Sequence, residues 1–399
     1  MPNVKKSMMA AAGSGGVEGY DLFTWGWHGG GGHETTNIST SSPVQVGDKS
    51  VWTRVQSGQN TSRGLQGDGS LWTWGHQSMM GDNGVSADAG VSKASSPVQV
   101  GSSTDWASVH GAWRTAFLTK SDGSLWTWGQ GSYGQLGTGT VLNISSPTQI
   151  GSLTDWGDGD HHAENKQMLT KFSNNKHCLA IKTDGTLWSW GYNSSKGMCG
   201  DGTAITRSSP VQIGTDTNWA HCAAGEHTSF AIKTTGALFS WGGGQQGRLG
   251  NNSSGNTGIS SPVQVGALTD WKQIGAGKIH THAIKTDGTL WYVGGHATGG
   301  VNGIGHTGII RSSPTQIGSD TNWAYCIHSG HAEKHAGCIK TDGTLWLWGA
   351  AGTGRMGLGD NIDYSSPVQV GSETDWLHAQ AHSTSATQGV TFGLRGTRE

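Results

Sequence analysis

The sequence predicts an all-β fold, a seven-bladed β-propeller of four-stranded antiparallel blades whose ring is closed by half repeats at the two ends of the chain. Three observations predict it: a unit of about 50 residues recurs, each copy carries signals for four short strands, and the chain begins and ends in the middle of a copy. Repeats of this length form solenoids or propellers, because one copy cannot bury its apolar face alone. A helical solenoid would need an apolar period of about 3.6 residues, and the sequence shows none.

The spacing of the repeat is clearest from its prolines. Seven of the eight follow a Ser-Ser pair, at intervals of 54, 50, 63, 52, 52 and 53 residues. They are Pro43, Pro97, Pro147, Pro210, Pro262, Pro314 and Pro367. A tryptophan heads the segment that follows each of them, and these are Trp52, Trp106, Trp156, Trp219, Trp271, Trp323 and Trp376. Seven such copies predict seven blades.

Each copy contains four strand-like segments. The first begins at the head tryptophan, and the second often ends in Ala-Ile-Lys, as at 283–285. Asp-Gly pairs such as Asp287-Gly288 follow, which predicts a hairpin with a type I′ turn and positive φ at both central residues. The third segment alternates as Leu-Trp-x-Trp, so both faces of its sheet are apolar and must be covered. Because proline cannot donate to a ladder, we expect it at the start of the fourth strand, at the sheet edge.

The two ends of the chain complete each other. Residues 20–26 match the second half of a copy, whereas the copy headed by Trp376 runs out after its first half. The two halves therefore predict a blade that is built from both ends. We expect residues 20–399 to form the propeller and residues 1–19 to be a flexible tail, because the apolar part of this tail is too short for a signal peptide.

Composition limits the classes of function. The chain has 20 Trp among 399 residues, and each buried Trp removes roughly 150–250 Å² from water, which makes a core possible despite few aliphatic residues. The net charge of −2 lacks the positive footprint of a nucleic-acid binder, so we expect no contact with DNA or RNA. No apolar run approaches the roughly 18 residues of a membrane helix. Five irregularly spaced Cys favour buried thiols in a reducing compartment over a disulfide framework.

The unit headed by Trp156 departs from the pattern. Trp156 and Lys182 are 26 residues apart, whereas Trp271 and Lys285 are 14 apart. The 12 extra residues lie within 157–176, between the first and second strands, and should protrude from one side of the ring. Insertions of this kind often mark a binding face. A tolerated surface insertion is the alternative, and both interpretations stay open here.

Three motifs carry a family resemblance: Asp-Gly-Thr-Leu-Trp-x-Trp-Gly, an Ala-Gly-x-x-His-Thr-like turn at 276–281, and Gly-Gln-Leu-Gly at 134–137. They resemble the regulator of chromosome condensation repeat family, whose members are seven-bladed propellers, and the resemblance covers residues 20–399. The chain is most similar to stand-alone bacterial and bacteriophage members, which implies a virion-associated component. The eukaryotic prototype implies an exchange factor for a small GTPase, although its basic nuclear tail is missing here.

No set of residues indicates an enzyme. The sequence has no nucleophile elbow and no recurring carboxylate pair, and turns account for the repeated Asp residues. Two G-x-G-x-x-G matches, at 129–134 and 242–247, precede blade loops rather than helices, so we expect no nucleotide cofactor. The His- and Cys-rich segment at 326–338 has the ligand types of a zinc site. Its His335 matches the family's His-Thr position, where a bond to the backbone is implied, so we assign no metal and keep this segment as an open alternative.

Exposed loops are the remaining candidates for function. The longest variable segments separate Trp-Gly from Ser-Ser-Pro, at 27–40, 76–94, 130–144, 192–207, 243–258, 295–311 and 350–364. Aromatic side chains in such loops often anchor interfaces. We therefore predict a binding role for four loop residues and for one residue of a turn between the first and second strands. These are Trp27, Tyr133, Tyr192 and Tyr364 in the loops and Trp113 in the turn. Packing against the residue's own blade is the alternative for each.

We therefore predict a non-enzymatic structural or recognition protein that binds a protein, or alternatively a glycan, through its propeller loops and needs no cofactor. We expect it in a bacteriophage virion, in a bacterial surface assembly or in the cytoplasm of a bacterial host, with neither membrane insertion nor secretion. The alternative, from a different class, is a regulator of a partner protein, either a guanine nucleotide exchange factor for a small GTPase or an enzyme inhibitor.

Overall fold

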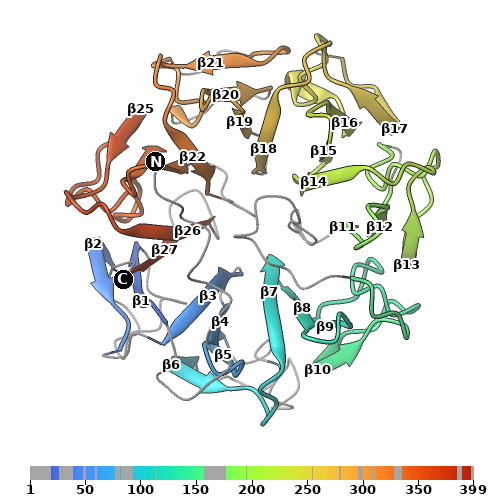
Figure 1. Cartoon of the computed structure of the whole chain (residues 1–399), viewed down its shortest axis with the longest axis horizontal. Coiled ribbons are helices and arrows are strands. Elements are labelled where there is room, and N and C mark those ends of the chain that lie inside the picture. The colour runs from blue at the N-terminus through green and yellow to red at the C-terminus, as the bar shows by residue number, and fades with distance from the viewer. Residues whose placement is uncertain are drawn as a thin grey trace, which may run out of the picture.

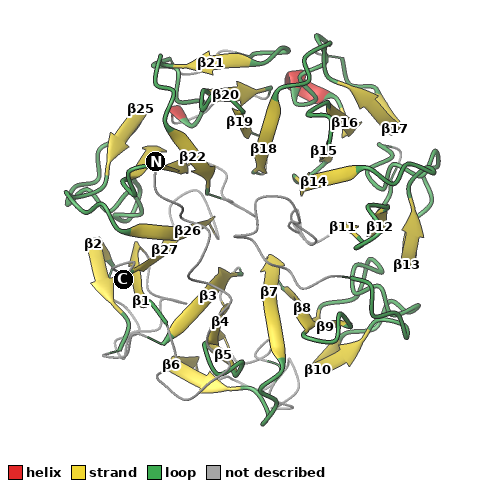
Figure 2. Ribbon diagram, viewed as in Figure 1, coloured by secondary structure: helices red, strands yellow, loops and turns green. Residues whose placement is uncertain are grey.

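The chain folds into a ring of seven antiparallel β-sheets arranged as the blades of a propeller (Figure 1). The computed structural model describes residues 19–26, 39–47, 51–58, 61–76, 81, 93–112, 114–156, 177–194, 196–253, 255–277, 280–294, 300–306, 310–327, 335–383 and 389–396. Strands dominate these residues (Figure 2), and the one named helical element among them is a single 3-10 turn, η3 (Gln245–Gly247). The predicted all-β, seven-bladed propeller is confirmed.

In the six blades with four described strands, the first strand lies nearest the centre of the ring and the fourth strand lies on the rim (Figure 1). We number the blades from the one that both chain ends build. Blade 1 contains β26 (Trp376–Ser383), β27 (Gly389–Arg395), β1 (Asp21–Gly26) and β2 (Thr40–Gln45). Blade 2 contains β3 (Trp52–Ser57), β4 (Thr61–Gln66), β5 (Leu71–His76) and β6 (Lys93–Gln99). Blade 3 contains β7 (Trp106–Ala112), β8 (Thr115–Lys120), β9 (Leu125–Gly129) and β10 (Ile144–Gln149).

The other four blades follow around the ring. Blade 4 has three described strands, β11 (His177–Ile181), β12 (Leu187–Gly191) and β13 (Arg207–Gln212), which correspond to the second, third and fourth strands of the other blades. Blade 5 contains β14 (Trp219–Ala224), β15 (Thr228–Lys233), β16 (Leu238–Gly243) and β17 (Gly258–Gln264). Blade 6 contains β18 (Trp271–Ala276), β19 (Thr281–Lys285), β20 (Leu290–Val293) and β21 (Thr315–Ile317). Blade 7 contains β22 (Trp323–Cys326), β23 (His335–Lys340), β24 (Leu345–Gly349) and β25 (Tyr364–Gln369). The predicted insertion at 157–176 in blade 4 lies outside the described residues.

Both chain ends meet in blade 1, as the half repeats predict. The strand order of this sheet is β2-β1-β27-β26, and β1 pairs with β27 along six residues, from Asp21 opposite Arg395 to Gly26 opposite Val390. The indole of Trp25 is fully buried and donates to the carbonyl oxygen of Arg355 in blade 7 at 2.9 Å. Closure therefore joins the first strand of the chain to its last strand and to the preceding blade.

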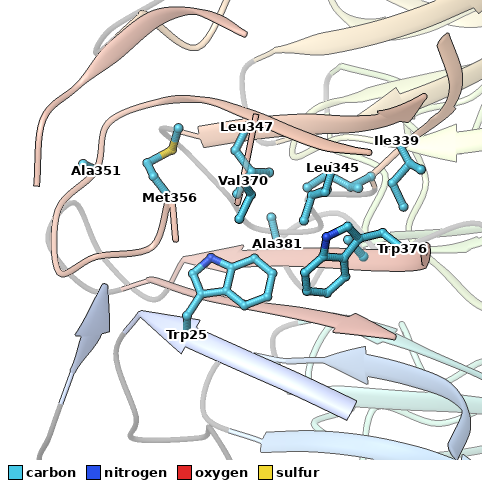
Figure 3. Packing of buried hydrophobic residues seen from close by; sticks show 11 residues of the cluster. Trp25, Ile339, Leu345, Leu347, Ala351, Met356, Val370, Trp376 and Ala381 are labelled. Atoms are coloured by element: carbon cyan, nitrogen blue, oxygen red, sulfur yellow. The ribbon is translucent and has the colours of Figure 1, made fainter. Parts of the chain in front are cut away.

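The hydrophobic core lies between the blades rather than inside any one of them. Seven clusters of buried side chains fill the seven gaps between neighbouring sheets. Figure 3 shows the cluster between blades 7 and 1, where Trp25 packs edge-on against Trp376 at 5.7 Å between ring centroids and Met356 lies nearby. The predicted alternation of the third strand is visible in β5, whose Trp74 packs toward blade 1 and whose Leu71 packs toward blade 3.

The repeated proline lies in a bulge of the edge strand, which corrects the expectation that it starts that strand. In blade 1 the pairing shifts so that Trp25 stands opposite the three residues between Thr40 and Val44, and Pro43 is one of them. A bulge leaves backbone groups out of the ladder, so the missing N–H of proline costs no ladder bond there. Blade 6 is closer to the expectation, because β21 begins directly after Pro314.

The same bulge connects neighbouring blades. The carbonyl oxygen of the first serine in Ser-Ser-Pro accepts a hydrogen bond from the third-to-fourth-strand loop of the preceding blade in five cases within the described ranges. Examples are the N–H groups of Gly139, Gly202 and Gly359, at 2.7, 2.8 and 2.7 Å from the oxygens of Ser208, Ser260 and Ser41. The near-uniform Ser-Ser-Pro sequence thus serves contacts between blades as well as a strand edge.

The Asp-Gly hairpins also differ from the expected type I′ geometry. Gly185 has φ of 79°, but Asp184 is not among the described non-glycine residues with positive φ. The N–H of Gly185 donates to the carbonyl of Lys182 at 2.9 Å, and the N–H of Lys182 donates to the carbonyl of Thr186 at 3.0 Å. This is the longer hairpin loop, in which a type I turn ends in a left-handed glycine, and only the glycine needs positive φ.

Deleting residues 1–47 removes β1 and β2, so β27 loses its six-residue partner strand and blade 7 loses the contacts of Trp25. We expect the thermal unfolding midpoint to fall by at least roughly 10 °C, because several large buried side chains lose their packing together. Circular dichroism melts measure this. Deletion of residues 1–18 alone is the control and should leave the midpoint within about 1 °C; equal stability of both truncations would contradict closure by the chain ends.

Candidate interaction surface

The two faces of the ring differ in how much the sequence and length of their loops vary from one blade to the next. Antiparallel strands reverse direction at each connection, so the first-to-second turns and the third-to-fourth loops of a blade lie at the same end of its sheet. We call this end of the ring the variable face; it carries, for example, loops 130–143 and 192–206. The second-to-third turns and the links between blades lie at the opposite end, which we call the repeat face.

On the repeat face, five blades place a lysine at or directly after the end of the second strand. These are Lys120, Lys182, Lys233, Lys285 and Lys340. Each ammonium nitrogen lies 4.1–5.0 Å from the centroids of two aromatic rings. Each also lies 2.7–3.2 Å from an aspartate oxygen. Arg395 takes this place in blade 1 and pairs with Asp375, whereas Gln66 takes it in blade 2. Cation–π and ionic contacts therefore stabilise six blades at the repeat face.

The turn aspartates of the repeat face are structural as well. Asp287 Oδ1 accepts hydrogen bonds from the backbone N–H and the hydroxyl of Thr289, at 2.9 and 2.7 Å, and the hydroxyl oxygen accepts from the indole of Trp291 at 2.8 Å. The hydrogen bonds from Thr289 lower the pKa of Asp287. These bonds explain why the sequence repeats Asp-Gly-Thr-Leu-Trp.

On the variable face, two of the predicted binding residues come together. Tyr133, in the loop of blade 3, and Tyr192, in the loop of blade 4, meet edge-to-face with 5.3 Å between ring centroids. Tyr133 is 36 % exposed, and Tyr192 is half-buried. The pair spans the boundary between two blades, so a partner that touches it contacts both loops.

Two aliphatic residues that the sequence analysis did not select lie in the same loops. Leu142 is 68 % exposed and Ile205 is 60 % exposed. Internal hydrogen bonds hold both loops: Asn143 Oδ1 accepts from the N–H of Gly131 at 2.9 Å, and buried Asn193 donates to the carbonyl of Ile205 at 3.2 Å. Loops fixed from within can present apolar side chains without a large entropic cost of ordering on binding.

A sequence signal for these aliphatic residues existed. Leu142 and Ile205 each stand three residues before the Ser-Ser pair of their unit, and so does Ile362, which is 59 % exposed. This recurrence of an exposed apolar residue at one position of the unit is the signal that could have selected Leu142 and Ile205. We use the name tyrosine patch for the contacting pair Tyr133 and Tyr192 together with Leu142 and Ile205, which belong to the same two loops.

The other predicted binding residues do not join this patch. Tyr364 is half-buried, packs against the core between blades 7 and 1, and donates its hydroxyl to Asp360 at 2.9 Å. It therefore folds back on its own blade, which is the alternative that the sequence left open. Trp27 and Trp113 lie outside the described residues, so their roles stay predictions.

A serine–histidine pair between blades 4 and 5 lacks the arrangement of a nucleophile. His177 Nε2 and Ser229 Oγ are 2.8 Å apart and both residues are fully buried. The Ser229 hydroxyl donates to the carbonyl of Met198 at 2.8 Å, so its proton is directed away from the imidazole. An activated serine needs its proton on the base and an open approach for substrate. The pair instead links two blades.

The described residues contain no group of three or more His, Cys, Asp or Glu side chains placed to hold a metal ion. In the segment 326–338, Cys326 and Cys338 face each other across β22 and β23 with 3.2 Å between sulfurs, and His335 contacts the hydroxyl of Thr391 in blade 1 at 3.4 Å. His328 and His331 lie outside the described part of the chain. All five cysteines are buried and none is disulfide-bonded. Within the described ranges, no helix has the length and apolar character to cross a bilayer.

The repeat model described as "Regulator of chromosome condensation (RCC1) repeat" matches residues 122–162, 184–232, 235–284 and 342–386. The chain is 27 % identical over 263 residues to the ultraviolet-B receptor UVR8 of Arabidopsis thaliana, which covers 65 % of this chain and 56 % of that protein. It is 26 % identical over 310 residues to the E3 ubiquitin-protein ligase HERC2 of Homo sapiens, which covers 76 % of this chain and 6 % of that protein. The chain thus spans little more than half, or far less, of these relatives.

Solved structures share the fold. Human WBSCR16 superposes with a TM-score of 0.77 at 17 % identity, covering 94 % of this chain and 100 % of that one. Prp20p of Saccharomyces cerevisiae, described with its binding properties to Gsp1p and histones, superposes with a TM-score of 0.75 at 18 % identity, covering 96 % and 93 %. Identities this low establish a common architecture and nothing about a shared site.

Lys285, on the repeat face of blade 6, allows a direct test of the lysine contacts. Lys285 is 7 % exposed and lies between Trp271 and Trp291, while its partner Asp270 is 42 % exposed. We expect Lys285→Ala to lower the free energy of unfolding by about 1–2 kcal/mol, because the cation–π contacts are shielded but the ion pair is partly screened. Lys285→Gln, the residue found at Gln66, should cost less. Urea denaturation measures the free energy of unfolding of both variants. Lys272→Ala, at an exposed position of the same blade, is the control. If Lys272→Ala lowered the free energy of unfolding as much as Lys285→Ala does, a stabilising role of the Lys285 contacts would be contradicted.

Two buried histidines predict loss of stability in acid. Burial lowers the pKa of His177 and of His110 to about 3. In the unfolded chain, both imidazoles bind a proton below about pH 6.5, so the unfolded state binds protons that the folded state does not. The free energy of unfolding should therefore fall as pH decreases from about 6.5 toward 4, by up to about 1.4 kcal/mol per pH unit for each histidine. In the His177→Gln variant, the slope of the free energy of unfolding against pH should decrease by the contribution of one bound proton. An unchanged slope would show that His177 is protonated in the folded state.

Proposed function

Because the chain belongs to the regulator of chromosome condensation (RCC1) repeat family, we propose that it is a non-catalytic recognition module that binds a protein partner through the variable face of its propeller. The observation that carries the proposal is the contact of Tyr133 with Tyr192 across two blades. Tyrosine supplies large apolar contact area together with a polar tip, and clusters of such residues dominate the affinity of protein interfaces.

The architecture supports this use of one face. On the repeat face, the recurrent aromatic rings, lysines and aspartates are engaged with one another. On the variable face, the tyrosine patch presents apolar side chains from loops that are held by buried hydrogen bonds. Rigid presentation of exposed apolar groups is typical of a preformed binding surface.

The relatives favour regulation of a partner as the specific form of this function. The structure of Prp20p was reported together with its binding to Gsp1p and histones. A second yeast structure is a complex of Kap60 with Prp20. A receptor and ubiquitin ligases also contain related segments. By analogy, this propeller would act as an exchange factor or inhibitor of a partner enzyme. The virion or surface-assembly setting and a glycan ligand rest on resemblance to phage and bacterial proteins alone.

The test is affinity capture with the full chain as bait from lysate of its native source, followed by quantitative mass spectrometry. We expect a partner whose recovery falls at least about tenfold when Tyr133 and Tyr192 are both changed to Ala, since loss of two interface aromatics costs about 1.4 kcal/mol or more. Leu153→Ala is the matched control, because Leu153 is 46 % exposed at the link between the same two blades but on the repeat face.

The identity of the partner then separates the alternatives. A small GTPase or a single soluble enzyme would support regulation, and fixed-stoichiometry capsid, tail or surface proteins would support an assembly role. Equal recovery with the tyrosine variant and with wild type would reject the tyrosine patch as the binding surface. Unfolding midpoints of both variants should match wild type, which excludes loss of fold as the cause.

A further inference from the structure

The gap between blades 2 and 3 contains a cation where three other gaps contain a phenylalanine ring. Arg63 is the third residue of β4, and its equivalents in β8, β15 and β27 are Phe117, Phe230 and Phe392. Phe117 packs on Trp190 of the next blade with 5.9 Å between ring centroids, and Phe392 packs on Trp74 at 6.2 Å. Arg63 occupies the corresponding place over Trp128, with its guanidinium carbon 5.7 Å from the ring centroid.

Arg63 is fully buried, and no hydrogen bond joins its guanidinium to the part of the chain that the structure describes. Its exposed fraction is 0 %, and Nε, Nη1 and Nη2 all lack a hydrogen-bond partner among the described residues. Burial lowers the pKa of Arg63 to about 10, with no carboxylate acting on it, so the group stays charged at neutral pH. A guanidinium has five N–H donors, and buried charges in proteins are ordinarily paired. A single cation–π contact compensates only part of the lost hydration.

The surroundings of Arg63 include a second donor without a partner among the described residues. Thr61 lies two residues earlier in β4, so its side chain projects from the same face of the sheet. Its hydroxyl is also fully buried without a partner. Gln56 is the register partner of Arg63 in β3 and donates its amide to the carbonyl of Gly111 in blade 3 at 2.5 Å. Gly111 approaches the cation closely, because a Cβ there would lie 3.2 Å from Nη1 of Arg63 and 2.6 Å from the carbonyl oxygen of Thr115.

From this arrangement we propose that Arg63 and Thr61 bind one small monovalent inorganic anion, chloride being the first choice, in the gap between blades 2 and 3. The two side chains supply guanidinium and hydroxyl donors, and one positive charge is balanced by one negative charge. Full burial excludes an organic anion or a side chain of a partner, because neither can enter a closed gap between two sheets. The anion would act as a structural counter-ion, and this site is independent of the binding function proposed for the tyrosine patch.

The first experiment follows the thermal unfolding midpoint of the full chain while chloride rises from about 2 to about 200 mM. Sodium gluconate holds the ionic strength constant, since gluconate is too large for the gap. A ligand that binds only the folded state raises the midpoint with its concentration, and we expect a rise of roughly 1–3 °C for the wild type. Arg63→Phe, which copies Phe117 and Phe392, should show no rise.

Phe117→Leu is the matched control, because it changes the equivalent residue in the next gap without touching a charge, and it should keep the chloride dependence of the wild type. A flat wild-type midpoint, or an equal chloride dependence in Arg63→Phe, would overturn the proposal. If Arg63→Phe fails to fold, wild-type crystals soaked in bromide decide the question by anomalous scattering. A bromide peak within hydrogen-bond reach of Arg63 supports the site, and a bromide-soaked crystal without that peak overturns it.

Discussion

Contact between neighbouring blades is the interaction on which the rest of this structure depends. Each sheet is apolar on both faces, so a blade alone would expose at least one row of Trp, Leu or Phe side chains to water. β5 shows this directly, because Trp74 belongs to the core shared with blade 1 and Leu71 to the core shared with blade 3. An open row of such blades would always end in two uncovered faces. Closure through β1 and β27 removes both at once.

The fold could be predicted because its determinants repeat, whereas the contacts between units could not. Half repeats at the two ends predict the composite blade, and alternation in Leu-Trp-x-Trp predicts a sheet covered on both sides. The bulge at Pro43 was missed because a proline signals only that an N–H is absent, and both a strand start and a bulge meet that condition. The hairpin type was missed because Asp-Gly fits two loop lengths, and only the hydrogen bonds of Lys182 distinguish them.

The candidate site could be predicted only in part, for a related reason. Tyr133 and Tyr192 were each selected as loop aromatics, but their contact depends on how adjacent blades place their loops. Tyr364 has the same residue type and a similar loop position, yet a hydrogen bond to Asp360 and packing on the core turn it inward. Residue type thus identifies what can bind, and the neighbouring side chains decide whether it is presented. Leu142 and Ile205 were overlooked because aliphatic residues in loops are common singly.

The repeat itself separates structural residues from residues that carry individual chemistry. Residues that recur in most blades, such as the lysines between aromatic rings, are needed wherever the same junction is built, so they report on stability. Where a different residue replaces a recurrent one at an equivalent position, the shared junction does not explain it. Arg63 in place of phenylalanine gives up apolar packing on Trp128 and buries a charge, so its gap differs chemically from the others. Among the described loops, the tyrosine pair likewise occurs at one boundary between blades. In a ring of near-equivalent units, the departures from equivalence are therefore the positions at which function can reside.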